Sequence, residues 1–382
     1  MQGDVPLALS RIRGQDHAIE LIAAARATGR LSHAYLFRGP EGVGKETTAL
    51  ELAKALNCEA GGLDGCGECG SCRMADGLHH PDIHLIFPMP RTAKASERGD
   101  VLKKRATDGY RDEGFGRKTA ILSVETVLRE VVVKANQRPY VGPWKVFIIA
   151  DADRMTTEAA NTLLKTLEEP PEMTVIVLTT ARPSSLPATV VSRCQNIQFA
   201  RLDRETVREI LVGDPRLGFD DESARSAAAL AQGSAGRAAR AGRDGLAAEI
   251  DRVAGMMGGK RPTSVKALVE TAERLAYRLG RREQERILEL MLLWYRDVLL
   301  VEARGRECAD ADVLYAGYRG DLELQAGGMD LAAVGRLIDR IEAARRAIER
   351  YSNPSIVFTS VLLDVAVARR KAEERGEARH AA

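Results

Sequence analysis

The chain has 382 residues, too many for one ordinary core, so its length predicts two or three domains. Its formal net charge is +2, and composition alone therefore does not indicate strong binding to nucleic acid or to a membrane surface. No run of eighteen apolar residues occurs, which excludes a membrane-spanning helix. The first twenty residues lack the apolar core of a secretion signal, so we expect a cytoplasmic protein with reduced cysteines.

A glycine-rich loop follows the first predicted strand, the apolar run 35–37. Residues 39–45 read GPEGVGK, the G-x-x-x-x-G-K pattern whose backbone N–H groups cradle phosphates while the lysine reaches the outer ones. Apolar residues at helical spacing follow over 49–56, which completes the strand, turn and helix that this motif requires. The nucleotide-binding candidates in this segment are Gly39, Gly42, Gly44, Lys45 and Thr47.

The residue after the loop lysine departs from the pattern. A serine or threonine is required there because its hydroxyl binds Mg²⁺, whereas position 46 is Glu. Thr47 cannot simply take over, since one helical step rotates a side chain by about 100°. We therefore expect the fold of a nucleotide-binding ATPase, with ATP or ADP binding weak or absent.

Four of the six cysteines form a cluster with the spacing C-x7-C-x2-C-x2-C: Cys58, Cys66, Cys69 and Cys72. Tetrahedral Zn²⁺ takes four thiolates at about 2.3 Å, and C-x2-C lets two sulfurs converge through one tight turn. The spacing predicts a closed, structural zinc site, with an iron–sulfur cluster as the alternative. The other cysteines and the histidines beyond the cluster are expected to be ordinary structural residues: Cys194, Cys308, His79, His80 and His84.

Strands and helices alternate through the first half of the chain. Apolar runs at 82–87, 145–150 and 174–179 predict strands, and the run 145–150 is typical of a strand buried on both faces of a parallel sheet. Helical spacing follows Ser123, a candidate N-cap, and recurs over 160–167 before two prolines. This alternation predicts an α/β fold with a mainly parallel sheet.

Residues 91–118 interrupt this pattern with nine Lys/Arg and five Asp/Glu, a net charge of 9 − 5 = +4. We expect a flexible inserted loop there, with contact to DNA as the alternative. Beyond residue 203 only helix-like segments occur, among them 221–231, 264–278 and 283–300. The charged tail 372–382 is expected to be frayed.

Four segments together resemble a known family, the AAA+ subunits of the bacterial DNA polymerase III clamp loader: residues 31–47, 58–72, 145–172 and 186–199. The resemblance extends over about residues 8–245 and more loosely to the C-terminal helices, through 294–300. It implies an AAA+ P-loop core over 1–202, with a parallel sheet flanked by helices, the zinc module at 58–72 and the charged insertion at 91–118. An all-α lid over 203–247 and an all-α collar domain for assembly over 248–371 would follow.

The resemblance also distinguishes two types of subunit. The ATPase gamma/tau type carries an Asp-Glu pair after the second core strand. Here the pair falls on Ala150 and Asp151, or on Asp151 and Ala152, so either register loses one carboxylate. Together with Glu46, this favours the delta-prime type, with little or no intrinsic ATPase and with polymerase chemistry in other subunits.

Family roles are implied for further residues. Arg193, in Ser-Arg-Cys, resembles an arginine finger that acts in trans on a neighbour's ATP; a guanidinium is permanently charged and forks onto phosphate oxygens. The alternative is a surface arginine in a salt bridge. Asp151 joins the nucleotide site, Thr180 resembles sensor 1, and Arg237 resembles sensor 2 more loosely.

The implied partners are the gamma/tau ATPase and delta subunits, and the sliding clamp and primed DNA through the assembled hetero-oligomer. Two other functions remain open at this stage. One is a catalytically active gamma-type ATPase that tolerates Glu46. The other is a stand-alone zinc-bearing DNA-binding protein with a relic nucleotide fold.

Overall fold

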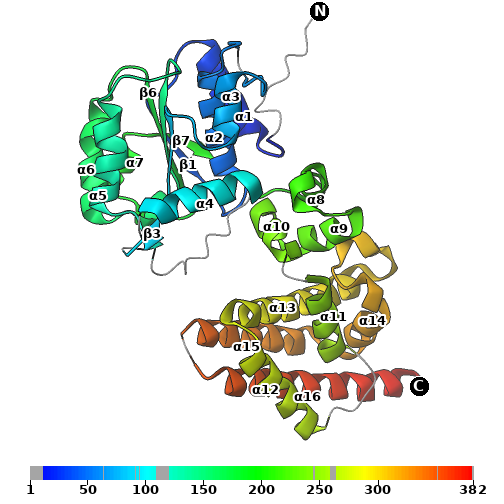
Figure 1. The fold of residues 1–382 in the computed structure, drawn as a ribbon. Coiled ribbons are helices and arrows are strands. Elements are labelled where there is room, and N and C mark those ends of the chain that lie inside the picture. Colours follow the sequence, from blue (N-terminus) through cyan, green and yellow to red (C-terminus); the bar gives the residue numbers. More distant parts are fainter. Residues whose placement is uncertain are drawn as a thin grey trace, which may run out of the picture. The chain divides into compact units, whose positions relative to one another are not determined.

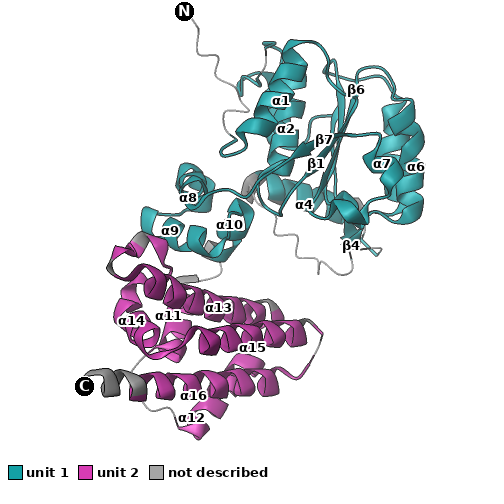
Figure 2. Ribbon diagram, turned by 180° about the vertical axis from the view of Figure 1, so that it is seen from behind, with its two compact units in different colours: residues 1–241 teal, residues 242–382 magenta. Residues whose placement is uncertain are grey.

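The computed structural model describes residues 12–62, 64–90, 92–93, 95–108, 120–243, 246–258, 264–350 and 352–380. The chain forms two compact units, residues 1–241 and 242–382, which Figure 2 colours separately. Among the described helices, none has both the length and the apolar character needed to cross a membrane.

Unit 1 is built on a five-stranded parallel sheet with the strand order β2-β5-β6-β1-β7. Its strands are β1 (Ala34–Arg38), β2 (Ile83–Ile86), β5 (Lys145–Ile149), β6 (Thr174–Thr180) and β7 (Gln195–Gln198). The predicted strands and their parallel arrangement are confirmed, and β5 and β6 are buried along their whole length. Strand β7 was not predicted, because in its sequence QNIQ only Ile197 is buried.

Helices cover both faces of the sheet (Figure 1). On one face α1 (Asp16–Ala27) and α2 (Lys45–Leu56) pack on side chains such as Phe37 and Ile148. On the other face lie α5 (Val124–Val127), its π-helical continuation Leu128–Val133, α6 (Thr157–Glu168) and α7 (Ala188–Val191). Ser123 caps α5 as predicted, because its hydroxyl accepts the N–H of Thr126.

Part of the charged insertion is a helix rather than the flexible loop that its composition predicted. Residues Ala95–Asp108 form helix α4, while residues 109–119 lie outside the described part of the chain. Val101 and Leu102 of α4 pack against the core beside the sheet, and Arg98 and Arg105 lie 5.9 and 3.9 Å from the Phe87 ring centroid. These contacts are tertiary and leave no apolar periodicity in the sequence, which explains the wrong prediction.

Short elements complete unit 1: α3 (Gly70–Asp76) within the cysteine segment, and the two-stranded antiparallel sheet of β3 (Met89–Pro90) and β4 (Ala120–Ile121) beside the insertion. Three helices follow the sheet: α8 (Arg204–Gly213), α9 (Asp221–Leu230) and α10 (Ala235–Arg243). Asp203 and Asp220 cap α8 and α9 through their carboxylates. Residues 203–241 belong to the same compact unit as the sheet.

Unit 2 is helical, as predicted for the C-terminal half. Its helices are α11 (Leu246–Met257), α12 (Val265–Arg278), α13 (Arg281–Arg304), α14 (Arg319–Gly328), α15 (Leu331–Glu349) and α16 (Pro354–His380). Trp294 is fully buried and donates its indole N–H to Gln325 Oε1 at 3.1 Å. Buried Asp297 accepts the N–H groups of Leu314 and Tyr315 at 2.6 and 3.0 Å.

The tail is more regular than expected. Helix α16 continues to His380, so the frayed tail predicted over 372–382 is not observed as far as residue 380. Ala372 is buried, and a Cβ built on Gly328 would lie 2.3 Å from its carbonyl oxygen. This close packing holds the start of the tail in the helix. Short 3₁₀ turns connect the longer elements at Ala152–Arg154, Pro183–Ser185, Pro215–Leu217, Gly305–Glu307, Asp310–Asp312 and Ala316–Tyr318.

Candidate functional site

The glycine loop lies where the sequence predicted it, between β1 and α2. Gly42 has φ 71°, in the left-handed region that favours glycine, and a Cβ there would lie 2.3 Å from Ser234 Oγ. Gly39 also has no room for a side chain, since its Cβ would lie 2.3 Å from the carbonyl oxygen of Phe199. Gly44 immediately precedes α2, so the loop amides point from a helix N-terminus, a favourable site for an anion.

Lys45 is the first residue of α2 and is 7 % exposed. Its Nζ donates to the carbonyl oxygens of Gly39 and Pro40 at 2.7 and 2.5 Å, so the lysine folds back along its own loop. Thr47 lines the adjoining cavity and is exposed, while Thr48 bonds the carbonyl of Gly44 at 2.9 Å.

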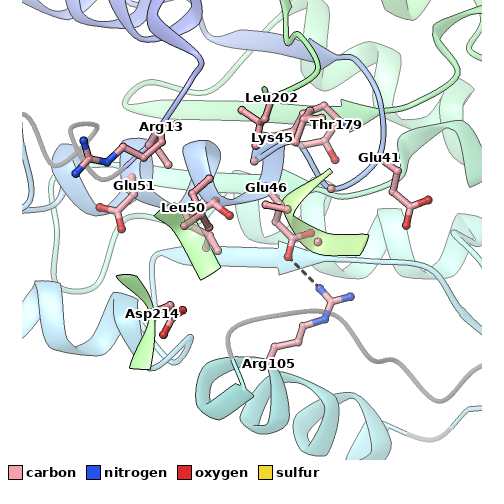
Figure 3. Close-up of a pocket in the computed structure, with 18 of the residues that line it drawn as sticks. Arg13, Glu41, Lys45, Glu46, Leu50, Glu51, Arg105, Thr179, Leu202 and Asp214 are labelled. Atoms are coloured by element: carbon pink, nitrogen blue, oxygen red, sulfur yellow. Dashed lines mark hydrogen bonds and ion pairs between the residues drawn. The ribbon is translucent and has the colours of Figure 1, made fainter. Parts of the chain in front are cut away.

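A cavity of about 750 Å³ opens beside the loop, entirely within unit 1 (Figure 3). This volume lies within the usual range of small-molecule sites. Its apolar lining includes one side chain from before the sheet, one from α2, one from the loop after α3, one from before α8 and one from α8: Ile12, Leu50, Leu78, Leu202 and Ile210. Its polar lining includes Gly42, Gly44, Lys45, Glu46, Arg105, Asp151 and Thr179.

Glu46 is paired with an arginine from the insertion. Arg105 Nη1 lies 3.3 Å from Glu46 Oε1, and Figure 3 shows the pair reaching across the cavity from α2 and α4. The Arg105 side chain is only 6 % exposed. Burial lowers the pKa of Arg105 to about 10, against the opposing effect of the Asp151 carboxylate, so the guanidinium stays charged at neutral pH. Sequence reasoning missed Arg105 because it assigned the segment to a flexible loop.

Of the predicted acidic pair, one residue reaches the cavity. Asp151 lines it, with φ 48°, and its N–H donates to Thr179 Oγ1 at 3.3 Å. Ala150 is buried and donates its N–H to the carbonyl of Ile86 at 2.8 Å. Ala152 is also buried. In either register, therefore, residues 150–152 bring one carboxylate to the cavity.

The two predicted sensor residues, Thr180 and Arg237, are not among the residues that line the cavity. Thr180 is buried and donates to Asp153 Oδ1 at 2.8 Å, while Arg182 binds Oδ2 of the same carboxylate at 2.9 and 2.7 Å. Its neighbour Thr179 lines the cavity instead. Among the described lining residues, Arg240 is present and Arg237 is not.

The first turn of α10 contacts the glycine loop directly. The N–H of Gly236 donates to the carbonyl of Gly42 at 3.1 Å, and a Cβ on Gly236 would lie 3.1 Å from Gly42 Cα. One turn further along α10, Arg240 Nη2 lies 3.2 Å from Glu41 Oε1. A backbone hydrogen bond and a salt bridge thus join the glycine loop to α10.

Arg193 lies after α7 and is not among the residues that line the cavity. Its Nη2 lies 2.5 Å from Glu168 Oε1, and its Nη1 donates to the carbonyl of Thr189 at 3.0 Å. The arginine side chain is 35 % exposed. The structure therefore shows the salt bridge of the alternative hypothesis, at a partly exposed position that leaves the finger role untested.

The structure brings together the predicted metal ligands Cys58, Cys66, Cys69 and Cys72, whose sulfurs all lie within 4.8 Å of one another. Cys66 Sγ and Cys72 Sγ are 3.9 Å apart, close to the about 3.8 Å expected for two ligands of a tetrahedral ion with 2.3 Å bonds. Backbone N–H groups of Cys66, Cys69 and Cys72 each donate to a cluster sulfur at 3.3 Å. Hydrogen bonds from the backbone of Glu68 and Cys69 lower the pKa of Cys66 to about 6, whereas burial raises the pKa of Cys72. This all-sulfur donor set fits Zn²⁺.

The neighbouring histidines have other contacts. His80 is buried, with Nε2 3.0 Å from Ser71 Oγ and Nδ1 accepting the N–H of Asp82 at 3.1 Å. His84 stacks on Phe147 with ring centroids 4.8 Å apart. Within the described residues, the candidate metal group contains the four cysteines and no histidine.

Part of the chain is similar in sequence to known proteins. Residues 14–203 match the family model described as DNA polymerase III, delta subunit. The chain is 35 % identical over 198 residues to DNA polymerase III subunit delta′ of Bacillus subtilis, covering 52 % of this chain and 51 % of that protein. It is 29 % identical over 272 residues to DNA polymerase III subunit tau of Escherichia coli, covering 70 % of this chain and 36 % of that protein.

A DNA polymerase III gamma subunit-related protein from Thermotoga maritima is 16 % identical, with a TM-score of 0.39 and coverage of 93 % of this chain and 99 % of that chain. The chain spans about half or less of the length of the curated relatives it matches. The fold and loop define a protein of the phosphate-binding-loop class. Within that class, the chain belongs to the DNA polymerase III delta-subunit-like family, which includes the delta′ and tau/gamma relatives.

Proposed function

We propose that the chain is a subunit of the DNA polymerase III clamp loader, of the delta-prime type. It helps to open the sliding clamp and load it on primed DNA, in a cytoplasmic hetero-oligomer with gamma/tau and delta subunits. The family match and the delta′ and tau relatives support this proposal. The helices beyond the sheet would serve as lid, over 203–247, and as collar, over 248–371.

The Glu46–Arg105 pair is the observation that favours the delta-prime type. In phosphate-loop ATPases, the hydroxyl after the lysine and an acidic residue after the second strand hold Mg²⁺ on the phosphates. Here a carboxylate replaces the hydroxyl and is neutralised by a guanidinium, while residues 150–152 contribute one carboxylate to the cavity. Such a site does not hold Mg²⁺ in the ordinary way, so Mg²⁺-dependent ATP binding is weak or absent and hydrolysis is low.

The subunit would act on ATP through its neighbour. Arg193 is permanently charged, partly exposed and absent from the lining of its own cavity, as expected of an arginine that reaches an adjacent subunit. The sensor roles of Thr180 and Arg237 remain part of the proposal, although Thr180 bonds Asp153 and the arginine of α10 that lines the cavity is Arg240.

The cysteine cluster would hold one structural Zn²⁺. With four thiolates as ligands, the ion has no open position for substrate, and it would fix the segment between α2 and α3. It supplies no chemistry to nucleotide turnover.

Partner capture tests the proposal. The tagged full-length chain, expressed in its native cells, should recover gamma/tau and delta subunits in stoichiometric amounts when its partners are identified by mass spectrometry. Recovery of DNA without those subunits would instead support the stand-alone DNA-binding protein.

An active gamma-type ATPase is the second candidate. The match to E. coli tau favours it, because that match covers 70 % of the chain against 52 % for delta′. Steady-state ATP turnover by the purified chain separates the two types.

A further inference from the structure

We propose that Arg105 takes the place of the divalent cation in this phosphate-loop cavity, so that the cavity binds a nucleoside di- or triphosphate without a metal ion. This inference rests on the proposed function only in treating the cavity as a nucleotide site. It concerns an equilibrium binding property of the single chain and involves no covalent step.

The position of Arg105 carries the argument. The two protein groups that hold Mg²⁺ in a working phosphate loop are the side chain after the loop lysine and the acidic residue after the second strand. In this chain those positions are Glu46 and Asp151, and both line the cavity with Arg105. The guanidinium bonds the first at 3.3 Å and interacts electrostatically with the second. A protein cation therefore lines the same cavity as the two carboxylates, bonded to one and attracted by the other.

Arg105 is also fixed in that position. Its guanidinium carbon lies 3.9 Å from the Phe87 ring centroid, within the range of a cation–π contact. The residue is buried, and α4 is held by Val101 and Leu102 against the core. Because the cation is covalently part of the chain, it cannot dissociate as Mg²⁺ does. A chelated or metal-free solution leaves it in place.

The rest of the cavity suits a nucleotide. Loop amides and Lys45 offer donors for phosphates at one part of the lining, and Ile12, Leu202 and Ile210 offer apolar surface for a base. Without Arg105, the Glu46 carboxylate would repel a polyphosphate. With it, the pair is neutral, and an arginine fork is well matched to phosphate oxygens. A guanidinium cannot activate water as a metal does, so binding proceeds without hydrolysis.

The test is a fluorescence-anisotropy titration of the full-length chain with N-methylanthraniloyl-ADP, in buffer with excess Mg²⁺ and in resin-treated buffer without Mg²⁺. A free chelator is avoided because it would also remove the metal ion proposed for the cysteine cluster. The dissociation constants in the two buffers should agree within about twofold. Arg105→Ala should weaken binding at least about tenfold in both buffers.

Arg98→Ala is the matched control, since Arg98 lies on the same helix, contacts the same Phe87 ring and pairs with Glu130 at 3.0 Å, outside the set of lining residues. It should bind ADP like the wild type. Glu46→Gln keeps the shape of the site and leaves Arg105 less neutralised, so it should bind more tightly. Thermal melting of each variant separates loss of binding from loss of fold.

Three results would overturn the inference: no binding in either buffer, binding that is lost more than about tenfold without Mg²⁺, or wild-type affinity in folded Arg105→Ala protein. None of these results bears on whether the chain joins a clamp loader, because partner capture measures that separately. Conversely, metal-independent ADP binding by a chain that captures no clamp-loader subunits would retain this site and reject the proposed function.

Discussion

Arg193 and Glu168 form a salt bridge in which Nη2 and Oε1 lie 2.5 Å apart. Glu168 is the last residue of α6, and Arg193 follows α7, so the salt bridge joins the end of α6 to the segment after α7. The side chains are 35 % and 46 % exposed, and pairs of this kind contribute at most about 1 kcal/mol. Arg193 can therefore exchange Glu168 for a stronger anion at little cost in stability.

That exchange leads to the first prediction. Arg193→Ala protein should fold and assemble normally but lower the DNA-stimulated ATPase and the clamp-loading rate of the reconstituted complex. An arginine finger contributes about 10³–10⁵ in rate in other phosphoryl-transfer systems, and a ring with several ATPase sites dilutes that loss. Lys should rescue poorly, because it lacks the fork. Wild-type loading by the Arg193→Ala complex would leave Arg193 as a surface salt-bridge residue.

The isolated chain should show no meaningful ATP hydrolysis, because Glu46 stands where the pattern requires a magnesium-binding hydroxyl and is paired with Arg105. Glu46→Thr alone should not restore activity, since residues 150–152 still bring a single carboxylate to the cavity. Phosphate release by purified protein measures this. Turnover comparable to a working ATPase, abolished by Lys45→Ala, would contradict the prediction and favour the gamma type.

Elemental analysis should find one Zn²⁺ per chain. Structural zinc in small peptides contributes about 10–16 kcal/mol of apparent binding energy. Here the sheet has its own apolar core, so Cys69→Ser should release the metal and loosen the segment 58–80 without unfolding the chain. Cys308→Ser, at a buried thiol in unit 2, is the control and should keep its zinc. Iron in place of zinc, or no metal, would refute the assignment.

His84 should remain neutral in mildly acidic solution, because burial lowers its pKa to about 4. In the unfolded chain the histidine binds its proton near pH 6.5. The free energy of unfolding therefore decreases as the pH falls from about 6.5 to 4, by about 2 kcal/mol at pH 5. An NMR titration of the His84 ring should give a midpoint close to 4. The stacked control His84→Phe should remove this part of the acid sensitivity. A midpoint at or above the ordinary value would disprove the prediction.

Gly42→Ala should destabilise unit 1 by about 1–3 kcal/mol, since the new methyl group would meet Ser234 and the residue has a left-handed φ of 71°. Gly335→Ala is the control: it lies within α15 with no atom near its Cβ position, and it should stabilise by about 0.5–1 kcal/mol. Thermal melting compares the two. Equal stability of Gly42→Ala and wild type would show that the loop can move away from α10.

The sequence allowed most of the fold to be predicted where local signals were strong. The apolar runs of β5 and β6 and the glycine loop each have a pattern that reads without tertiary knowledge. Strand β7 was missed because an edge strand with one buried side chain has no such run. Helix α4 was missed because its packing depends on Phe87 and on distant carboxylates.

The site was predictable to the same degree. The cysteine spacing and the loop lysine were sufficient to locate the metal group and the cavity wall. The partner of Glu46 was not, because Arg105 is distant in sequence and only the fold brings it across. Likewise, the sequence pointed to Thr180, whereas Thr179 lines the cavity. Neighbouring strand residues point to opposite faces, and β6 is buried on both faces, so its sequence does not indicate which face meets the cavity.

The contact between Gly42 and Gly236 gives the molecule a built-in reporter. The Gly236 amide hydrogen is held by the loop carbonyl, so it can exchange with solvent deuterium only when the loop and α10 separate. The exchange rate of this amide therefore measures how often the glycine loop and α10 separate. A bound ligand that spans the two would slow this single amide, and one that pushes them apart would speed it. Deuterium uptake at one glycine thus follows the opening of the cavity in real time, with no label added to the chain.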